Sequence, residues 1–140
     1  MTPGALKNGG WQPPVSVQAA ARRLFAEVIP NLETLAGDYR VDTDVLDDEI
    51  YRLFCAHLRE NVGALAAAVA ATDEKATRAF AHSLEGMGGT MGFPEISAVG
   101  TALSRSARAG EWPICRLLHE RLELWLQTAE AAARSGEPPP

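Results

Sequence analysis

Glycine and proline divide the chain into long segments of helical periodicity separated by short breaks. Pro30 ends the first segment, and the breaks at 92–94 and 110–113 separate the last three. Proline suits the first turn of a helix but not its interior, and glycine suits the position just after a helix. Because breaks this short join neighbouring helices, the last three segments are expected to pack antiparallel.

Composition favours helices over sheets. Ala and Leu account for 39 of the 140 residues, whereas Val, Ile and Thr together account for 20. Ala and Leu lose little rotamer freedom in a helix, and β-branched residues lose more. With 46% apolar residues, a chain of this length can form one hydrophobic core.

Five segments place apolar residues on one helical face, at about residues 16–29, 44–71, 73–91, 94–109 and 113–135. Asp42 or Thr43 would cap the second segment and Thr72 the third, since short polar side chains accept hydrogen bonds from free backbone amides. Four expected buried stripes are Val17, Ala21, Leu24 and Val28; Leu46, Ile50, Leu53, Phe54, Leu58 and Leu65; Ile96, Val99, Leu103 and Ala107; and Ile114, Leu118, Trp125 and Ala129. The fold class is therefore all-α, an up-and-down antiparallel four-helix bundle with an additional N-terminal helix.

The two ends of the chain lack this periodicity. Residues 1–14 hold three Pro and three Gly around Trp11, so we expect a flexible N-terminal arm whose tryptophan can dock. Residues 136–140 are expected to form a disordered Pro-rich tail, which leaves 15–135 as the helical domain with a connector at 31–41. The acidic run at 42–49 suits either a solvated helix start or a surface for partner docking.

Charge, cysteine content and hydropathy exclude several classes of protein. A net charge of −5 argues against nucleic-acid binding through a basic field. Cys55 and Cys115 form no CxxC pair, which suits a reducing cytoplasm. No stretch is apolar enough for a membrane span, and the first residues lack the apolar core of a signal peptide. We expect a cytoplasmic protein that binds neither nucleic acid nor membrane.

The most informative segment is residues 81–92, AHSLEGMGGTMG. On a helical wheel for 73–91, one face gathers the residues expected to be buried: Ala76, Phe80, Ser83, Leu84, Met87 and Met91. His82 points to the opposite, solvent-exposed side. The residues that share its face are Lys75, Arg78, Glu85, Gly86 and Gly89.

Three glycines follow His82 inside this predicted helix. Each costs about 0.8–1.0 kcal/mol relative to Ala in a helix interior, so their presence needs a physical reason. Gly88 lies off the His82 face and is best explained by close packing between helices. Gly86 and Gly89 lie on that face, where a missing side chain would leave room for a partner; tight packing is the alternative explanation.

This segment resembles the signature of histidine-containing phosphotransfer (HPt) domains, in which an exposed His is followed by Leu, Lys, Gly and then small residues. Downstream, Ile96 and Leu103 match the apolar pair of the family, and Ala107–Glu111 is similar to its usual ending. Upstream, the apolar positions of the preceding segment also match, so the resemblance extends over about 42–130.

The resemblance implies a phosphorelay function in two-component signal transduction. His82 would accept a phosphoryl group from a receiver-domain aspartyl phosphate and pass it to another receiver. The expected partners are a response-regulator receiver domain and a hybrid histidine kinase. The resemblance implies a monomeric phosphocarrier rather than an enzyme. No cofactor of its own is expected, because the partner receiver domain supplies both the Mg²⁺ and the carboxylate that carries the phosphoryl group.

One position departs from the family pattern. The family usually has Lys three residues after the His, where this chain has Glu85. Glu85 could accept a hydrogen bond from the imidazole and fix its tautomer, or Lys75 and Arg78 could supply the missing positive charge. Alternatively, the domain would be a non-catalytic docking module that binds a receiver or kinase without accepting phosphate. An unrelated helical bundle is the remaining hypothesis.

The other polar residues of interest are expected to be structural. His57 falls on the apolar side of its helix and is expected in the core, whereas His119 is expected at the surface. The three His have no metal-ligand spacing, so no metal site is predicted. Both cysteines are expected to pack as small residues on helix faces.

Overall fold

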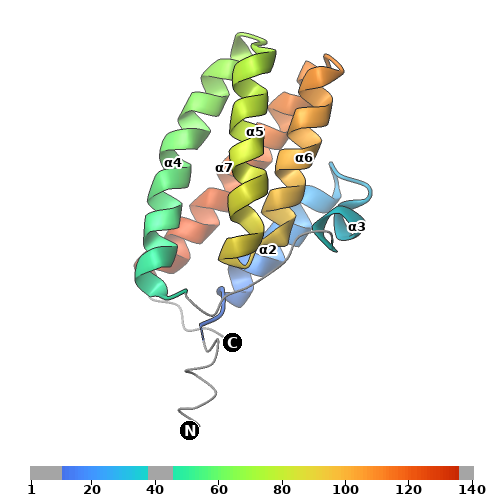
Figure 1. Ribbon diagram of the computed structural model, residues 1–140. Coiled ribbons are helices and arrows are strands. Elements are labelled where there is room, and N and C mark those ends of the chain that lie inside the picture. The colour runs from blue at the N-terminus through green and yellow to red at the C-terminus, as the bar shows by residue number, and fades with distance from the viewer. Residues whose placement is uncertain (1–10, 38–45, 136–140) are drawn as a thin grey trace, which may run out of the picture.

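The computed structural model describes residues 11–37 and 46–135, and within these ranges the chain forms helices and turns without a strand. The elements are α2 (Val15–Ala26), α3 (Leu32–Gly37), α4 (Asp48–Ala70), α5 (Glu74–Gly88), the 3-10 turn η1 (Gly89–Met91), α6 (Pro94–Arg108) and α7 (Trp112–Ser135). Helices α4 to α7 form an up-and-down bundle, with α2 packed on α7 and α3 on α6 (Figure 1). The predicted all-α bundle with an additional N-terminal helix is confirmed. The outer parts of the expected arm, 1–10, and the expected tail, 136–140, lie outside the described residues, as does 38–45.

Two aspartates fix where α4 and α5 begin. The Asp47 carboxylate accepts a hydrogen bond at 2.8 Å from the backbone N–H three residues later, and Asp73 does the same at 3.0 Å. The expected caps were wrong. Thr72 instead adopts a φ of 50° in the turn before Asp73, and α4 begins beyond Asp42 and Thr43, which lie outside the described residues.

The hydrophobic core is centred on aromatic rings from three elements. The Phe93 ring lies 5.1 Å from Trp125 and 6.3 Å from Phe54, measured between centroids, at distances typical of favourable ring pairs. The buried indole of Trp125 also donates a hydrogen bond at 3.0 Å to the carbonyl of Val17. This bond satisfies the only polar atom of the side chain and ties α7 to α2.

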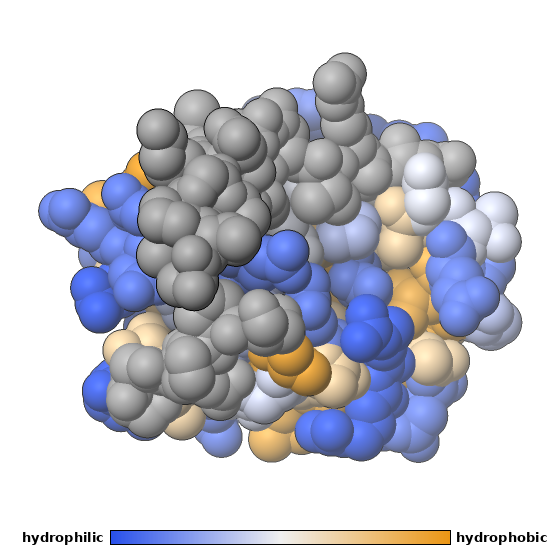
Figure 2. All heavy atoms as spheres, turned by 90° about the horizontal axis from the view of Figure 1, so that it is seen from below, coloured by the Kyte–Doolittle hydropathy of each residue, from blue (hydrophilic) through white to orange (hydrophobic). Residues whose placement is uncertain are grey.

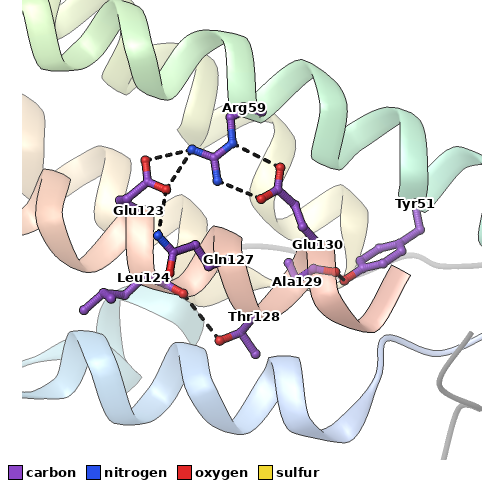
Figure 3. Close-up of polar contacts among 8 residues, drawn as sticks. All are labelled: Tyr51, Arg59, Glu123, Leu124, Gln127, Thr128, Ala129 and Glu130. Carbon is purple, nitrogen blue, oxygen red and sulfur yellow. Dashed lines mark hydrogen bonds and ion pairs between the residues drawn. The ribbon is translucent and has the colours of Figure 1, made fainter. Parts of the chain in front are cut away.

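A charged cluster joins α4 to α7 beside this core (Figure 3). Arg59 donates to Glu130 from Nε at 3.0 Å and from Nη2 at 2.7 Å, and its Nη1 donates to both oxygens of Glu123 at 2.7 and 2.8 Å. These bonds raise the pKa of Arg59 and lower the pKa of Glu123. Nearby, the Tyr51 hydroxyl donates to the carbonyl of Ala129 at 2.8 Å. Paired, directional contacts of this kind fix how α4 is placed along α7.

The tryptophan of the expected arm packs against the start of α4. Trp11 Nε1 donates to Asp48 at 2.9 Å, and its ring lies 5.7 Å from the ring of Tyr51. Viewed from below, the part of this end that is not covered in grey shows hydrophilic side chains around separate, smaller hydrophobic areas (Figure 2). Part of the predicted arm therefore closes the lower end of the core.

The buried face of α5 differs from the predicted one. Phe80 and Leu84 are buried as expected, but Ala76 and Ser83 are exposed. The buried positions that replace them are Thr77, Ala81 and Gly88. Residues this small or polar add little to a hydropathy pattern, yet they permit close approach of a neighbouring helix. The real face is therefore turned toward α6, the main packing partner of α5.

The stripe of α6 was predicted correctly, and those of α4 and α7 only in part. Leu53 is 62% exposed and His57 is also exposed, so neither belongs to the core. The α4 core runs through Tyr51, Phe54, Cys55, Leu58, Val62 and Leu65. In α7, Ile114 remains 38% exposed and lies outside the core, whereas Leu118, Trp125 and Ala129 are buried as expected.

Two glycines of α5 provide a matched test of this packing. A Cβ at Gly88 would lie 2.4 Å from the backbone nitrogen of Ser97, whereas a Cβ at Gly86 would meet nothing within 4 Å. We expect Gly88→Ala to lower the free energy of unfolding by about 1–3 kcal/mol through overpacking. Gly86→Ala should raise it by about 0.5–1 kcal/mol, because alanine loses less backbone entropy in a helix. Urea unfolding of both variants measures this, and equal effects would contradict the close-contact explanation.

Candidate functional site

His82 lies on the outer face of α5, which stands between α4 and α6 at the front of the bundle in Figure 1. Its side chain is 90% exposed. On the opposite side of the same helix, Phe80 and Leu84 are buried in the core. A rigid, anchored helix thus presents an imidazole to solvent with little of its surface covered, as the sequence predicts.

The imidazole borders an open hollow of about 740 Å³ between α5 and α6. Three further predicted site residues on α5, Lys75, Arg78 and Glu85, line this hollow, and Arg108 enters it from α6. Arg108 was missed as a site residue. The sequence indicated only that Arg108 belongs to the run 107–111, which resembles the usual ending of the family. Its place beside His82 depends on how α6 packs on α5, which the sequence does not reveal.

The glycines that follow His82 have different surroundings. Gly86 is exposed and its Cβ direction is open, which agrees with room for a partner. Gly88 is buried against α6, so the packing explanation is confirmed for it. The prediction for Gly89 was wrong: it is buried, and its N–H donates to Ser97 Oγ at 2.8 Å. The helix tightens into η1 at this residue, and a wheel of 100° per residue no longer applies.

Glu85 lies between the imidazole and α6. One carboxylate oxygen, Oε1, is 3.8 Å from His82 Nδ1, which is an ion-pair distance only when the ring is protonated and is too long for a hydrogen bond. The other oxygen, Oε2, accepts a hydrogen bond from Thr101 Oγ1 at 2.8 Å. The side chain of Glu85 is 29% exposed, so this carboxylate is held by α6 rather than extended into solvent.

The basic side chains of α5 that line the hollow precede His82 in the helix, whereas the glycines follow it. Lys75 is exposed, and Arg78 Nη1 pairs with Glu74 at 3.2 Å. Arg78 Nε is buried and makes no hydrogen bond to the described residues. The cations therefore precede the histidine along α5, at the positions one and two turns before it, instead of following it.

The remaining histidines and the cysteines lie away from this hollow. His57 is exposed, with Asn61 Nδ2 3.1 Å from its Nε2, so its predicted place in the core was wrong. Cys55 and Cys115 are free and buried. Burial raises the pKa of the Cys55 thiol to about 11 and also raises that of Cys115. Across 11–37 and 46–135, no group of three or more His, Cys, Asp or Glu could hold a metal ion.

Comparison with protein families shows the family to which this fold belongs. The family model of the Hpt domain matches residues 49–132, which include most of α4, all of α5 and α6, and most of α7. The chain belongs to the Hpt domain family. Hpt domains are phosphocarrier modules of two-component phosphorelays that interact with receiver domains and histidine kinases and use phosphohistidine.

No curated protein and no solved structure matches the chain. Among the helices of the described ranges, none is both long and apolar enough to cross a membrane.

The buried thiols lead to a simple reactivity prediction. With a pKa of about 11 for Cys55, roughly one thiol in a thousand is ionised at pH 8, and the thiolate is the reactive form. We expect an aromatic disulfide reagent to leave both cysteines of the native protein unmodified at pH 8 and to modify both in guanidinium chloride. Rapid modification of the native protein would contradict the burial of these side chains.

Proposed function

We propose that this Hpt domain relays a phosphoryl group between receiver domains through phosphorylation of His82. The observation that carries the proposal is the 90% exposure of the His82 side chain on an anchored helix, within the segment that matches the family. A response-regulator receiver and a hybrid histidine kinase are the proposed partners. The free, buried cysteines suit a reducing compartment, and we propose a cytoplasmic monomer.

The chemistry requires little from this chain beyond a well-placed nucleophile. A neutral imidazole nitrogen attacks the phosphorus of a receiver aspartyl phosphate, the bond between phosphorus and the aspartyl oxygen breaks, and the aspartate leaves as a carboxylate. The receiver supplies Mg²⁺, which offsets charge on the phosphoryl oxygens, and phosphoryl transfer otherwise depends mainly on in-line positioning. The reverse sequence, with a second receiver, completes the relay. An exposed imidazole next to Gly86 allows a receiver to approach.

The basic side chains of the hollow are proposed to replace the lysine that the family usually places after the histidine. Lys75, Arg78 and Arg108 line the same hollow as His82, and Lys75 lies one turn before Arg78 in α5. These cations offset the negative charge of Glu85 and attract the acidic site of a receiver.

A second candidate function is docking without phosphate acceptance. Glu85 favours it, because a carboxylate 3.8 Å from the ring would repel an incoming phosphoryl group. The two functions differ in one observable property, the presence of phosphohistidine on the chain.

A transfer assay separates these functions. A receiver phosphorylated by a small phosphodonor is mixed with the wild-type protein or with His82→Gln. We expect label that is acid-labile and base-stable on the wild type and none on the variant, because only the imidazole can form the P–N bond. Absence of label from a broad panel of receivers, with complex formation retained, would establish the docking function instead.

Charge variants test the role of the cations. We expect Arg78→Ala with Arg108→Ala to slow transfer by roughly tenfold at low salt, since electrostatic steering raises association rates by about 10–10³-fold. The difference should shrink as salt increases, because exposed charges are screened. The matched control is Arg52→Ala with Arg134→Ala, which removes two exposed arginines that border a separate hollow with Cys55. A similar loss in the control would show a general charge effect.

A further inference from the structure

Helix α6 approaches α5 closely beside Glu85. A Cβ at Gly100 would lie 2.8 Å from the backbone nitrogen of Glu85, 2.9 Å from its Cγ and 2.5 Å from the carbonyl oxygen of Ala81. Only a residue without a side chain permits this approach. The stem of Glu85 consequently lies against the backbone of α6, next to the position of Thr101.

Two hydroxyl groups of α6 then hold this residue. Ser97 Oγ donates to the backbone carbonyl of Glu85 at 2.9 Å, and Thr101 Oγ1 donates to its carboxylate oxygen Oε2 at 2.8 Å. With Oε2 bound on the α6 side, Oε1 is the oxygen on the His82 side, 3.8 Å from Nδ1. The position of the carboxylate is therefore set by the packing of two helices and not by solvent.

Other charged groups around the ring cannot take the same role. Lys75, Arg78 and Arg108 line the hollow but are cations, which donate hydrogen bonds and cannot accept one from the Nδ1–H of a neutral imidazole. The remaining carboxylate of the hollow, Glu74, is paired with Arg78 at 3.2 Å. Glu85 is thus the acceptor placed to bond the Nδ1 side of His82.

We propose that Glu85, held by Thr101, is a positioning residue that keeps the proton of neutral His82 on Nδ1 and leaves Nε2 to accept the phosphoryl group. The proposal rests on His82 being the phosphorylated residue. The proposed hydrogen bond requires the 90% exposed ring to turn toward Oε1, since the Nδ1–Oε1 separation is 3.8 Å in this structure. The hydrogen bond of one ring nitrogen decides which nitrogen carries the proton.

The reaction balances with this assignment. The lone pair of Nε2 forms the bond to phosphorus as the bond to the aspartyl oxygen of the donor breaks, and the Nδ1 proton stays in place. The ring then carries a positive charge, which faces the carboxylate of Glu85. A carboxylate at this position therefore stabilises the phosphorylated imidazole ring, whereas a lysine there would contact the phosphoryl oxygens.

The test measures the tautomer of His82 in the unphosphorylated full-length protein. Nitrogen-15 chemical shifts of both ring nitrogens, recorded above the titration range of the imidazole, give the fraction with the proton on Nδ1. We expect this fraction to fall in Thr101→Val, which removes the hydroxyl but keeps the charge of Glu85, and to be retained in Thr101→Ser. Equal fractions in the wild type and Thr101→Val would overturn the proposal.

A second pair of variants separates the hydrogen bond from the charge. Glu85→Ala should lower the Nδ1–H fraction, and Glu74→Gln, which removes a charge from the same hollow, should leave it unchanged. If both variants shift the fraction equally, the effect is electrostatic and the positioning role is wrong.

Phosphorylation by phosphoramidate distinguishes this inference from the relay itself. Phosphoramidate transfers its phosphoryl group directly to Nε2, and its own P–N bond breaks to release ammonia. The reaction therefore needs no receiver. We expect Thr101→Val to be phosphorylated several-fold more slowly than Thr101→Ser, and nitrogen-15 spectra to place the phosphoryl group on Nε2. Phosphorylation on Nδ1 would overturn the proposal. A normal tautomer pattern without transfer from any receiver would overturn the relay function but leave the positioning role intact.

Discussion

The contact between α5 and α6 is the constraint on which the site depends. It requires glycine at two positions, since a Cβ at Gly88 or at Gly100 would come within 2.5 Å of the backbone of the facing helix. This contact buries Ala81 and turns α5 so that His82 faces solvent. It also brings Arg108 of α6 into the hollow beside the imidazole. Close-packed interiors do not deform continuously, so the placement of the site follows from the packing of this pair of helices.

The charges around His82 are arranged differently from the usual pattern of the family. A carboxylate follows the histidine by one turn, and arginine and lysine precede it, at Arg78 and Lys75. The bond from Thr101 holds the carboxylate toward α6, and the cations line the same hollow nearer the N-terminal end of α5. From this geometry we propose separate roles: Glu85 orients the imidazole ring, and the basic side chains attract the phosphoryl group and the receiver.

Prediction from the sequence succeeded where the backbone preference of a residue type leaves one position open to it in a helix. Pro94 begins α6 and Gly92, with a φ of 87°, ends the preceding turn, as their backbone preferences require. Prediction failed where several residues were equivalent or where the signal was weak. Asp73 caps α5 in place of Thr72, and Gly89 is buried because the helix tightens there. The wheel missed the buried face made by Thr77 and its small neighbours, which carry little hydropathy.

The sequence alone determined the helical class, the order and approximate limits of the helices, and the exposed histidine with Lys75, Arg78 and Glu85 on its helix. These depend on local preferences and on periodicity within one helix, which neighbouring residues encode. The tertiary structure decided which partner each polar group takes. The bond from Thr101 to Glu85 and the entry of Arg108 join positions on different helices. The physical reason is that the rotation and spacing of packed helices arise from side-chain volumes at their contact, and no single helix contains that information.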